Sequence, residues 1–421
     1  MPISVRPFLL LGIALLSACT GPTPLNLMGT PVIYHRAAVD PFAHLPEAER
    51  IPPVTVFYAS NRGARDGLFD NRIGDELHVG RAKVQLGVAD DDWHDLYQAS
   101  ISEIRERELP LQLARVEPFG QLDLRQRVPA SLPPAIRAYV DAINLELAKA
   151  RDKEIIIYVH GAKVDFANAC ELTGEIVHFA GRDFIGLAYS WPSHQNILSY
   201  LLGTDVQRAR ESQAALASLI ELLARHTAAE RINLIAYSAG ARVASLALHT
   251  LQQRHTTLTT AQLKERYRLG AVVFAAGDVP EELFEERLPA ISQIAEQVLI
   301  TISDRDEALQ YAKRFMAGGP RIGSSQAEAA LQQFTYEHHL DNVTLLDVSR
   351  HWNERGFDIA GHHYWYRHAW ASSDVILLMR TNLPPARRGL SVSDHPELWY
   401  LGADYPDNVR RAVRRELQGQ W

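Results

Sequence analysis

The sequence is poor in cysteine, with only Cys19 and Cys170 among 421 residues. Because Cys19 falls inside a processing signal, the mature chain cannot depend on an internal disulfide framework. Cys170 is expected to be a small buried apolar residue. The remaining composition, 47% hydrophobic and 22% charged, is typical of a folded soluble protein. It excludes collagen-like, low-complexity and multi-spanning membrane proteins.

Long blocks of like charge and internal repeats are also absent from the sequence. The chain has 43 Lys and Arg against 50 Asp and Glu, which gives a formal net charge of -7. Because no basic stripe is formed, nucleic acid is not an expected partner. The length allows two or three average domains, or one large α/β core with an appendage.

The first apolar run of the chain is too short to cross a bilayer. It covers the nine residues Phe8 to Leu16 after a positive charge at Arg6, whereas a transmembrane helix needs about 20 residues. This layout predicts a secretory signal peptide over residues 1–18. The four residues that end at Cys19, LSAC, resemble the bacterial lipobox, in which the cysteine is lipidated and becomes the first residue.

That resemblance implies an envelope lipoprotein whose partner is a membrane, bound through the lipid on Cys19. Thr20, in place of an Asp after the cysteine, favours the outer membrane, with the protein facing the periplasm. The alternative is an ordinary signal peptide that is cut nearby and leaves Cys19 as a free thiol. Residues 19–53 contain seven prolines and little periodicity, which predicts a tether.

After the tether, strands and helices alternate along the chain. Residues 54–150 are expected to form an N-terminal extension of strands plus a helix, packed on the core. In residues 151–380, apolar strands such as Ile232 to Ala236 alternate with helices, which predicts a doubly wound, mostly parallel sheet covered on both faces. Residues 381–421 are predicted as a C-terminal tail. Catalytic groups in such sheets lie beyond the carboxyl ends of the strands.

One strand leads directly into a helix through a serine flanked by small residues. The segment Ala236-Tyr237-Ser238-Ala239-Gly240 has the A-x-S-x-G spacing of a nucleophile elbow, which holds the serine in a strained turn. An ordinary small-residue turn is the alternative. An earlier strand ends in His160-Gly161-Ala162, where an oxyanion-hole loop lies in this topology. We therefore predict the backbone N–H groups of Ala162 and Ala239 as oxyanion donors, and His160 as a structural residue.

The acid and the base of a triad are expected after later strands. Asp306 is the predicted acid and Asp278 its rival, although either could be a helix cap. The predicted base is His362, on a loop that Gly361 opens, with His363 beside it. A metal site formed by His362, His363 and His368 is the alternative. Because no HExxH motif or Cys/His pair accompanies them, neither a metal nor an organic cofactor is expected.

With serine, acid and histidine in this order, the chain resembles the α/β-hydrolase superfamily. More narrowly, it resembles a little-characterised bacterial α/β-hydrolase family over roughly residues 54–380. The motifs that carry the resemblance are FYASNR, YVHG, YSWPS, AYSAG, SDRDEAL and GHHY. It implies Ser238 as nucleophile, His362 as base and Asp306 as acid, and it brings no substrate. Tyr237 and Ala162-Lys163 depart from the family pattern, and Lys163 is expected to face solvent.

The favoured function is a serine hydrolase of carboxylic esters, acting on a small-molecule or lipid-like substrate. One alternative is a catalytically silent protein of this fold that binds an envelope ligand or partner. Another is an amidase or peptidase with the same triad. The segment Ser193 to Asp205 is predicted as either part of a lid or acyl pocket, or a packed connection. No feature of the sequence indicates a particular oligomeric state.

Overall fold

The structure is a computed structural model that describes residues 25–65, 68–194, 203–306, 309, 318–349, 368–393, 398–417 and 421. The predicted signal peptide, Cys19, His362 and His363 lie outside these residues. Among the described residues, no helix combines the length and the apolar character that a membrane span requires.

A single sheet of eleven strands forms the centre of the protein, in the order β10-β11-β9-β8-β7-β6-β4-β5-β1-β2-β3. Neighbours from β11 to β1 pair in parallel, whereas β10, β2 and β3 pair antiparallel to their neighbours at the two edges. The strands are β1 Val54–Arg65, β2 Leu68–Leu86, β3 Leu111–Asp123, β4 Glu154–Val159, β5 Ile185–Ser190, β6 Arg231–Tyr237, β7 Leu269–Ala275, β8 Ala295–Ile302, β9 Val343–Asp347, β10 Ser391–Val392 and β11 Leu398–Tyr400.

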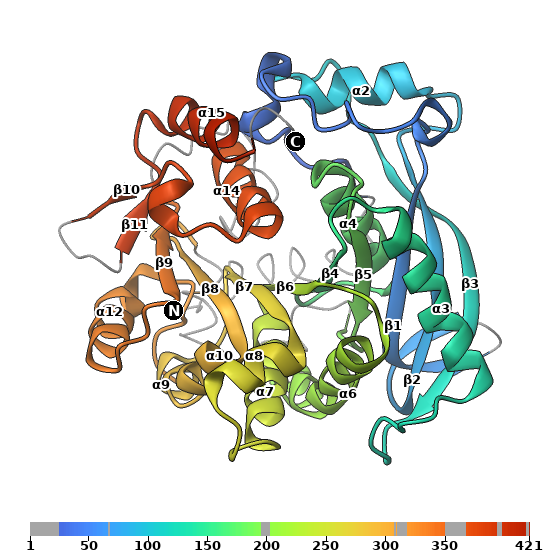
Figure 1. The fold of residues 1–421 in the computed structure, drawn as a ribbon, viewed down its shortest axis with the longest axis vertical. Coiled ribbons are helices and arrows are strands. Elements are labelled where there is room, and N and C mark those ends of the chain that lie inside the picture. The colour runs from blue at the N-terminus through green and yellow to red at the C-terminus, as the bar shows by residue number, and fades with distance from the viewer. Residues whose placement is uncertain are drawn as a thin grey trace, which may run out of the picture.

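Helices cover both faces of this sheet (Figure 1). They are α2 Trp93–Ile101, α3 Pro134–Lys149, α4 Phe166–Phe179, α6 Thr204–His226, α7 Gly240–Gln253, α8 Thr260–Tyr267, α9 Glu281–Glu285, α10 Leu288–Ile294, α12 Glu328–Glu337, α14 Ala369–Thr381 and α15 Tyr405–Glu416, with 3-10 turns η1 Val32–Ala37, η2 Glu47–Glu49, η3 Ser325–Ala327 and η4 Pro385–Arg387.

The two sides of the central strand β4 belong to different apolar cores. Ile155 and Ile157 pack in a core with residues of α3, α6, α7 and α10. Ile156 and Tyr158 pack in a second core with residues of α4, α14 and α15. Every residue of β4 is buried, as expected for a parallel strand covered on both faces. The predicted doubly wound, mostly parallel sheet is therefore confirmed.

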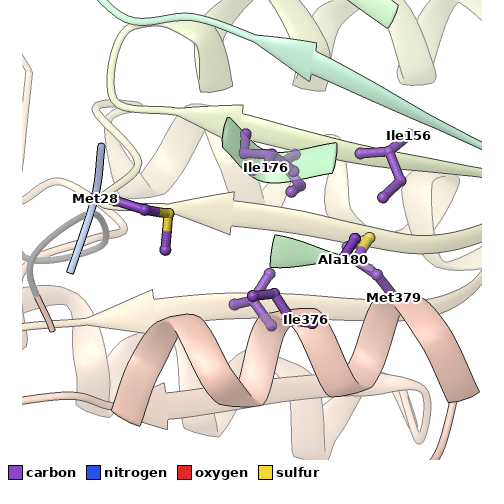
Figure 2. A pocket seen from close by; sticks show the side chains of 8 residues that line it. Met28, Ile156, Ile176, Ala180, Ile376 and Met379 are labelled. Carbon is purple, nitrogen blue, oxygen red and sulfur yellow. The ribbon is translucent and has the colours of Figure 1, made fainter. Parts of the chain in front are cut away.

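The segment predicted as a tether differs in its described part, because residues 25–50 pack on the body. Ile33, Tyr34 and Phe42 are at most 1% exposed. Met28 reaches between α4 and α14, where it lines an apolar space of about 10 Å³ (Figure 2). Proline limits regular secondary structure without preventing burial, so an aperiodic proline-rich segment can still contribute to a core.

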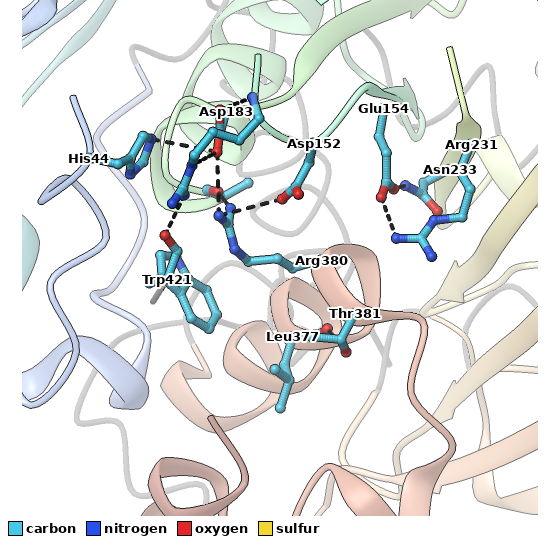
Figure 3. A network of polar contacts seen from close by, with 12 residues as sticks. His44, Asp152, Glu154, Asp183, Arg231, Asn233, Leu377, Arg380, Thr381 and Trp421 are labelled. Carbon is cyan, nitrogen blue, oxygen red and sulfur yellow. Dashed lines mark hydrogen bonds and ion pairs between the residues drawn. The ribbon is translucent and has the colours of Figure 1, made fainter. Parts of the chain in front are cut away.

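The predicted C-terminal tail is also part of the folded body. Strand β11 pairs in parallel with β9 and so extends the sheet. Trp421 is 4% exposed, and Arg151 donates a hydrogen bond to its carbonyl oxygen. In the same network, the Asp183 carboxylate accepts from the Arg151 backbone N–H at 2.9 Å and lies 3.5 Å from Arg380 of α14 (Figure 3). His44, in the described N-terminal segment, also lies 3.7 Å from Asp183, so this network joins the start of β5 to that segment and to Trp421.

Candidate active site

Ser238 lies in a strained turn between β6 and α7. Its φ of +52° falls in the left-handed region that residues with a side chain rarely adopt. Three backbone hydrogen bonds hold the turn: Ser238 N–H donates to Ala275 O (2.9 Å), and Ser238 O accepts from Ala241 N–H (3.0 Å) and Asp278 N–H (3.1 Å). The predicted nucleophile therefore has the backbone conformation of a nucleophile elbow.

The small residues around Ser238 are required by the close approach of strand and helix. A Cβ atom added to Gly240 would lie 2.3 Å from Val159 O and 2.6 Å from His160 O. One added to Gly161 would lie 3.1 Å from Ser238 Cβ. The absence of side chains at both glycines brings the turn after β4 next to the serine, where the oxyanion donors are expected.

The loop that follows Gly161 is fixed from two sides through the carbonyl oxygen of Val164. This oxygen accepts hydrogen bonds from Arg62 Nη2 (2.7 Å) and from Ser193 Oγ (2.8 Å). Arg62 is 1% exposed, and its Nε donates to Ser190 Oγ at 2.8 Å. Burial lowers the pKa of Arg62 to about 10, so its guanidinium is charged at neutral pH. Strands β1 and β5 thus position the loop that carries Ala162.

The two residues predicted as oxyanion donors differ in burial. Ala239 follows Ser238 directly and is fully buried, and Ala162 follows Gly161 and is half-buried. Lys163 is exposed, as expected, and has φ +59°. The lysine side chain is therefore open to solvent directly after Ala162.

His160 is fully buried directly after β4. Its ring stacks on Trp191 with centroids 5.4 Å apart, and the indole Nε1–H of Trp191 donates to His160 O at 2.7 Å. Desolvation, reinforced by the charge of Arg62, lowers the pKa of His160 to about 3. Its imidazole is therefore neutral at physiological pH, and it stabilises the strand end next to Gly161.

The two candidate acids have different surroundings. Asp278 is 1% exposed, and its carboxylate lies 2.8 Å from Arg321 Nε and 3.3 Å from Arg242 Nη2. Asp306 is also 1% exposed and follows β8; its Oδ1 accepts from the Leu309 backbone N–H at 3.1 Å. The Asp278 carboxylate thus lies next to two guanidinium groups. Asp306 accepts from the N–H three residues later, which is the helix-cap contact named above as the alternative to a catalytic role.

The histidine-rich loop lies mostly outside the described residues, and so does the predicted base His362. His368 is described: it is 5% exposed, and its Nδ1 accepts from the Trp370 backbone N–H at 3.2 Å at the start of α14. In the part of the chain that the structure describes, no three His, Cys, Asp or Glu residues are grouped as metal ligands.

Sequence reasoning missed the polar network behind the loop that follows Gly161. The Tyr189 hydroxyl lies 3.1 Å from Asn61 Oδ1 and donates to Ser212 O at 2.7 Å, which links β5 and β1 to α6. His194 Nδ1 lies 2.7 Å from the buried carboxylate of Asp205, across the predicted lid segment. The signal was present in the FYASNR and YSWPS motifs, whose polar residues serve this network.

A mostly parallel sheet with helices on both faces and a strained serine after a central strand defines an α/β hydrolase. A sequence model of the family described as alpha/beta hydrolase of unknown function (DUF900) matches residues 137–376. This match covers more than half of the chain, and the chain belongs to that family. The matched range contains every predicted triad residue and both oxyanion donors. No curated protein matches the chain in sequence.

Proposed function

We propose that this α/β hydrolase is a serine hydrolase of carboxylic esters, with Ser238 as nucleophile, His362 as base, Asp306 as acid, and Ala162 and Ala239 as oxyanion donors. The observation that carries the proposal is the strained backbone of Ser238, at φ +52°, beside a loop locked by Arg62 and Ser193. Strain of this kind persists where the surrounding structure imposes it, and it is concentrated at functional sites.

In the proposed reaction, Ser238 Oγ attacks the acyl carbon while His362 takes the hydroxyl proton. The carbonyl oxygen becomes an oxyanion, stabilised by the two backbone N–H groups. Collapse of the tetrahedral intermediate breaks the bond to the leaving oxygen, and His362 returns the proton to form the alcohol. Water, activated by the same histidine, then releases the acid and regenerates Ser238. Asp306 orients the imidazole throughout.

The proposed location is the outer membrane, facing the periplasm, with the chain attached through a lipid on Cys19. The proposed substrate is a small-molecule or lipid-like ester, since ester hydrolysis by this triad does not require a charged substrate. The lipobox-like sequence before Cys19 supports the location.

The test uses the chain without residues 1–18, short p-nitrophenyl esters and a fluorophosphonate probe. We expect turnover and labelling in the wild type, and at least about a thousandfold loss of turnover with loss of labelling in Ser238→Ala. Ser245→Ala is the matched control, because Ser245 is a buried serine on helix α7, which follows the Ser238 turn, and its Oγ donates to Arg242 O at 3.4 Å. Absence of both labelling and turnover in the folded wild type would refute the proposal.

A catalytically silent binding protein is the second candidate, and the residue that favours it is Tyr237. It stands in the elbow where the family pattern has a histidine, and it is 5% exposed. In a strain that lacks the gene, full complementation by Ser238→Ala would support this candidate over the hydrolase. An amidase or peptidase would use the same triad, and parallel assays on matched esters and amides distinguish it.

A further inference from the structure

Helix α15 has one apolar face and one face rich in arginine. Val409, Ala412 and Val413 are buried against the body. The outer side carries Arg410, Arg411, Arg414 and Arg415, which we call the basic face. Residues four apart lie above one another on a helix, so the pairs 410/414 and 411/415 form adjacent rows.

The carboxylates nearby neutralise only part of this charge. Asp407 lies 3.5 Å from Arg410, and Glu416 lies 2.6 Å from Arg415. Among the described residues, no carboxylate lies within ion-pair distance of Arg411 or Arg414, both of which are exposed. The chain as a whole has a formal charge of -7. The basic face is therefore a positive region on a negatively charged protein.

The basic face lies beside the N-terminal segment. Arg410 Nη2 donates to Val32 O of η1 at 3.1 Å. Arg36, near the end of η1, is 86% exposed and lies 3.4 Å from the Glu103 carboxylate, which offsets its charge. Figure 1 shows η1 next to α15 at the top of the view. Between Cys19 and Leu25 the chain can span at most about 22 Å, so a lipid on Cys19 would hold Leu25, whose carbonyl oxygen accepts from the Leu111 N–H, within about that distance of the bilayer.

We propose that the basic face of α15 docks on the anionic headgroups of the membrane. Each Lys or Arg near an anionic surface strengthens binding, and guanidinium groups bind phosphate oxygens through two parallel hydrogen bonds. The negative charge on the rest of the protein is repelled by the same surface, so docking through α15 also orients the molecule. The proposal does not depend on whether Ser238 is catalytic.

Vesicle flotation tests the proposal with the unlipidated chain that begins at Gly21 and contains every described residue. We expect binding to vesicles of phosphatidylglycerol and phosphatidylethanolamine and little binding to phosphatidylcholine vesicles. Binding to the anionic vesicles should be lost in 0.5 M salt, because the Debye length is then only a few ångströms. Arg411→Glu with Arg414→Glu should weaken binding to the anionic vesicles at least about tenfold.

The matched control is Arg115→Glu with Arg137→Glu, which changes the net charge equally at exposed positions on β3 and α3. It should retain affinity within about threefold. If the glutamate variant fails to fold by circular dichroism, Arg411→Gln with Arg414→Gln replaces it. Equal losses in variant and control would overturn the proposal. It would equally be overturned by a wild type that binds a short RNA duplex but no vesicle, which would indicate a nucleic-acid site.

Discussion

Single residues at the elbow determine how closely β4 and α7 approach each other. Gly240 has no room for a methyl group, because the added Cβ would press on the carbonyl oxygens of Val159 and His160. These are backbone atoms at the buried end of β4 and directly after it, and they cannot move aside cheaply. The Ser238 turn therefore depends on a glycine two residues later, and the A-x-S-x-G spacing expresses this steric requirement.

We predict that Gly240→Ala lowers the free energy of unfolding by at least about 2 kcal/mol, since overpacking a tight interior site costs about that much. It should also abolish labelling of Ser238 where the protein remains folded. Chemical denaturation with the fluorophosphonate probe measures both effects. Gly319→Ala is the control, because an added Cβ there meets nothing within 4 Å. Equal stability of the two variants would contradict the steric argument.

At the level of elements, the strands from β9 to β2 could be predicted, whereas the edge strands β3, β10 and β11 could not. Strands β4 and β6 are short apolar runs buried on both faces, so hydrophobicity alone identifies them. Strand β3 was missed because it is an edge strand with many exposed positions and a proline at Pro118. The serine and its loop followed from spacing, whereas the support from Arg62 depends on contacts between residues about 100 positions apart.

The N-terminal segment is joined to helix α4 by a buried carboxyl group. Glu175 is 1% exposed, and its Oε2 accepts from the Met28 backbone N–H at 2.7 Å. Burial raises its pKa to about 8, opposed by this hydrogen bond and by Arg105. Because the folded pKa is above the ordinary value of 4.5, the contribution to stability is complete below pH 4.5 and is lost as the pH rises through 8.

We therefore predict that, between pH 5 and pH 9, the unfolding free energy of the wild type falls by at least about 1.4 kcal/mol relative to that of Glu175→Gln, because the buried histidines contribute equally to both proteins. Denaturant unfolding at a series of pH values provides the measurement. The control is Glu146→Gln on helix α3, where the glutamate side chain is 36% exposed. This change should leave the pH dependence of the unfolding free energy as it is in the wild type. Parallel profiles for the wild type and Glu175→Gln would count against a protonated Glu175.

At the scale of the whole molecule, residues 25–50 act as part of the hydrolase body. Their apolar side chains fill the second core beside α4, α14 and α15, and His44 joins the network at the start of β5. Composition suggested a tether because prolines interrupt any periodicity, and periodicity is what identifies a helix or strand in a sequence. Burial of an irregular segment depends on a complementary surface that distant elements provide.

This difference predicts distinct outcomes for two truncations. Removal of residues 1–24 leaves every described contact in place, so the melting temperature should change by less than about 2 °C. Removal of residues 1–53 exposes the surface that Ile33, Tyr34 and Phe42 cover, and each buried side chain of this size contributes about 1.5–3 kcal/mol. The combined loss is comparable to the whole stability of an ordinary domain, so the shorter protein should be unfolded or aggregated. Calorimetry measures the melting temperature of both truncated proteins. If residues 25–53 were only a tether, both truncations would leave the melting temperature unchanged.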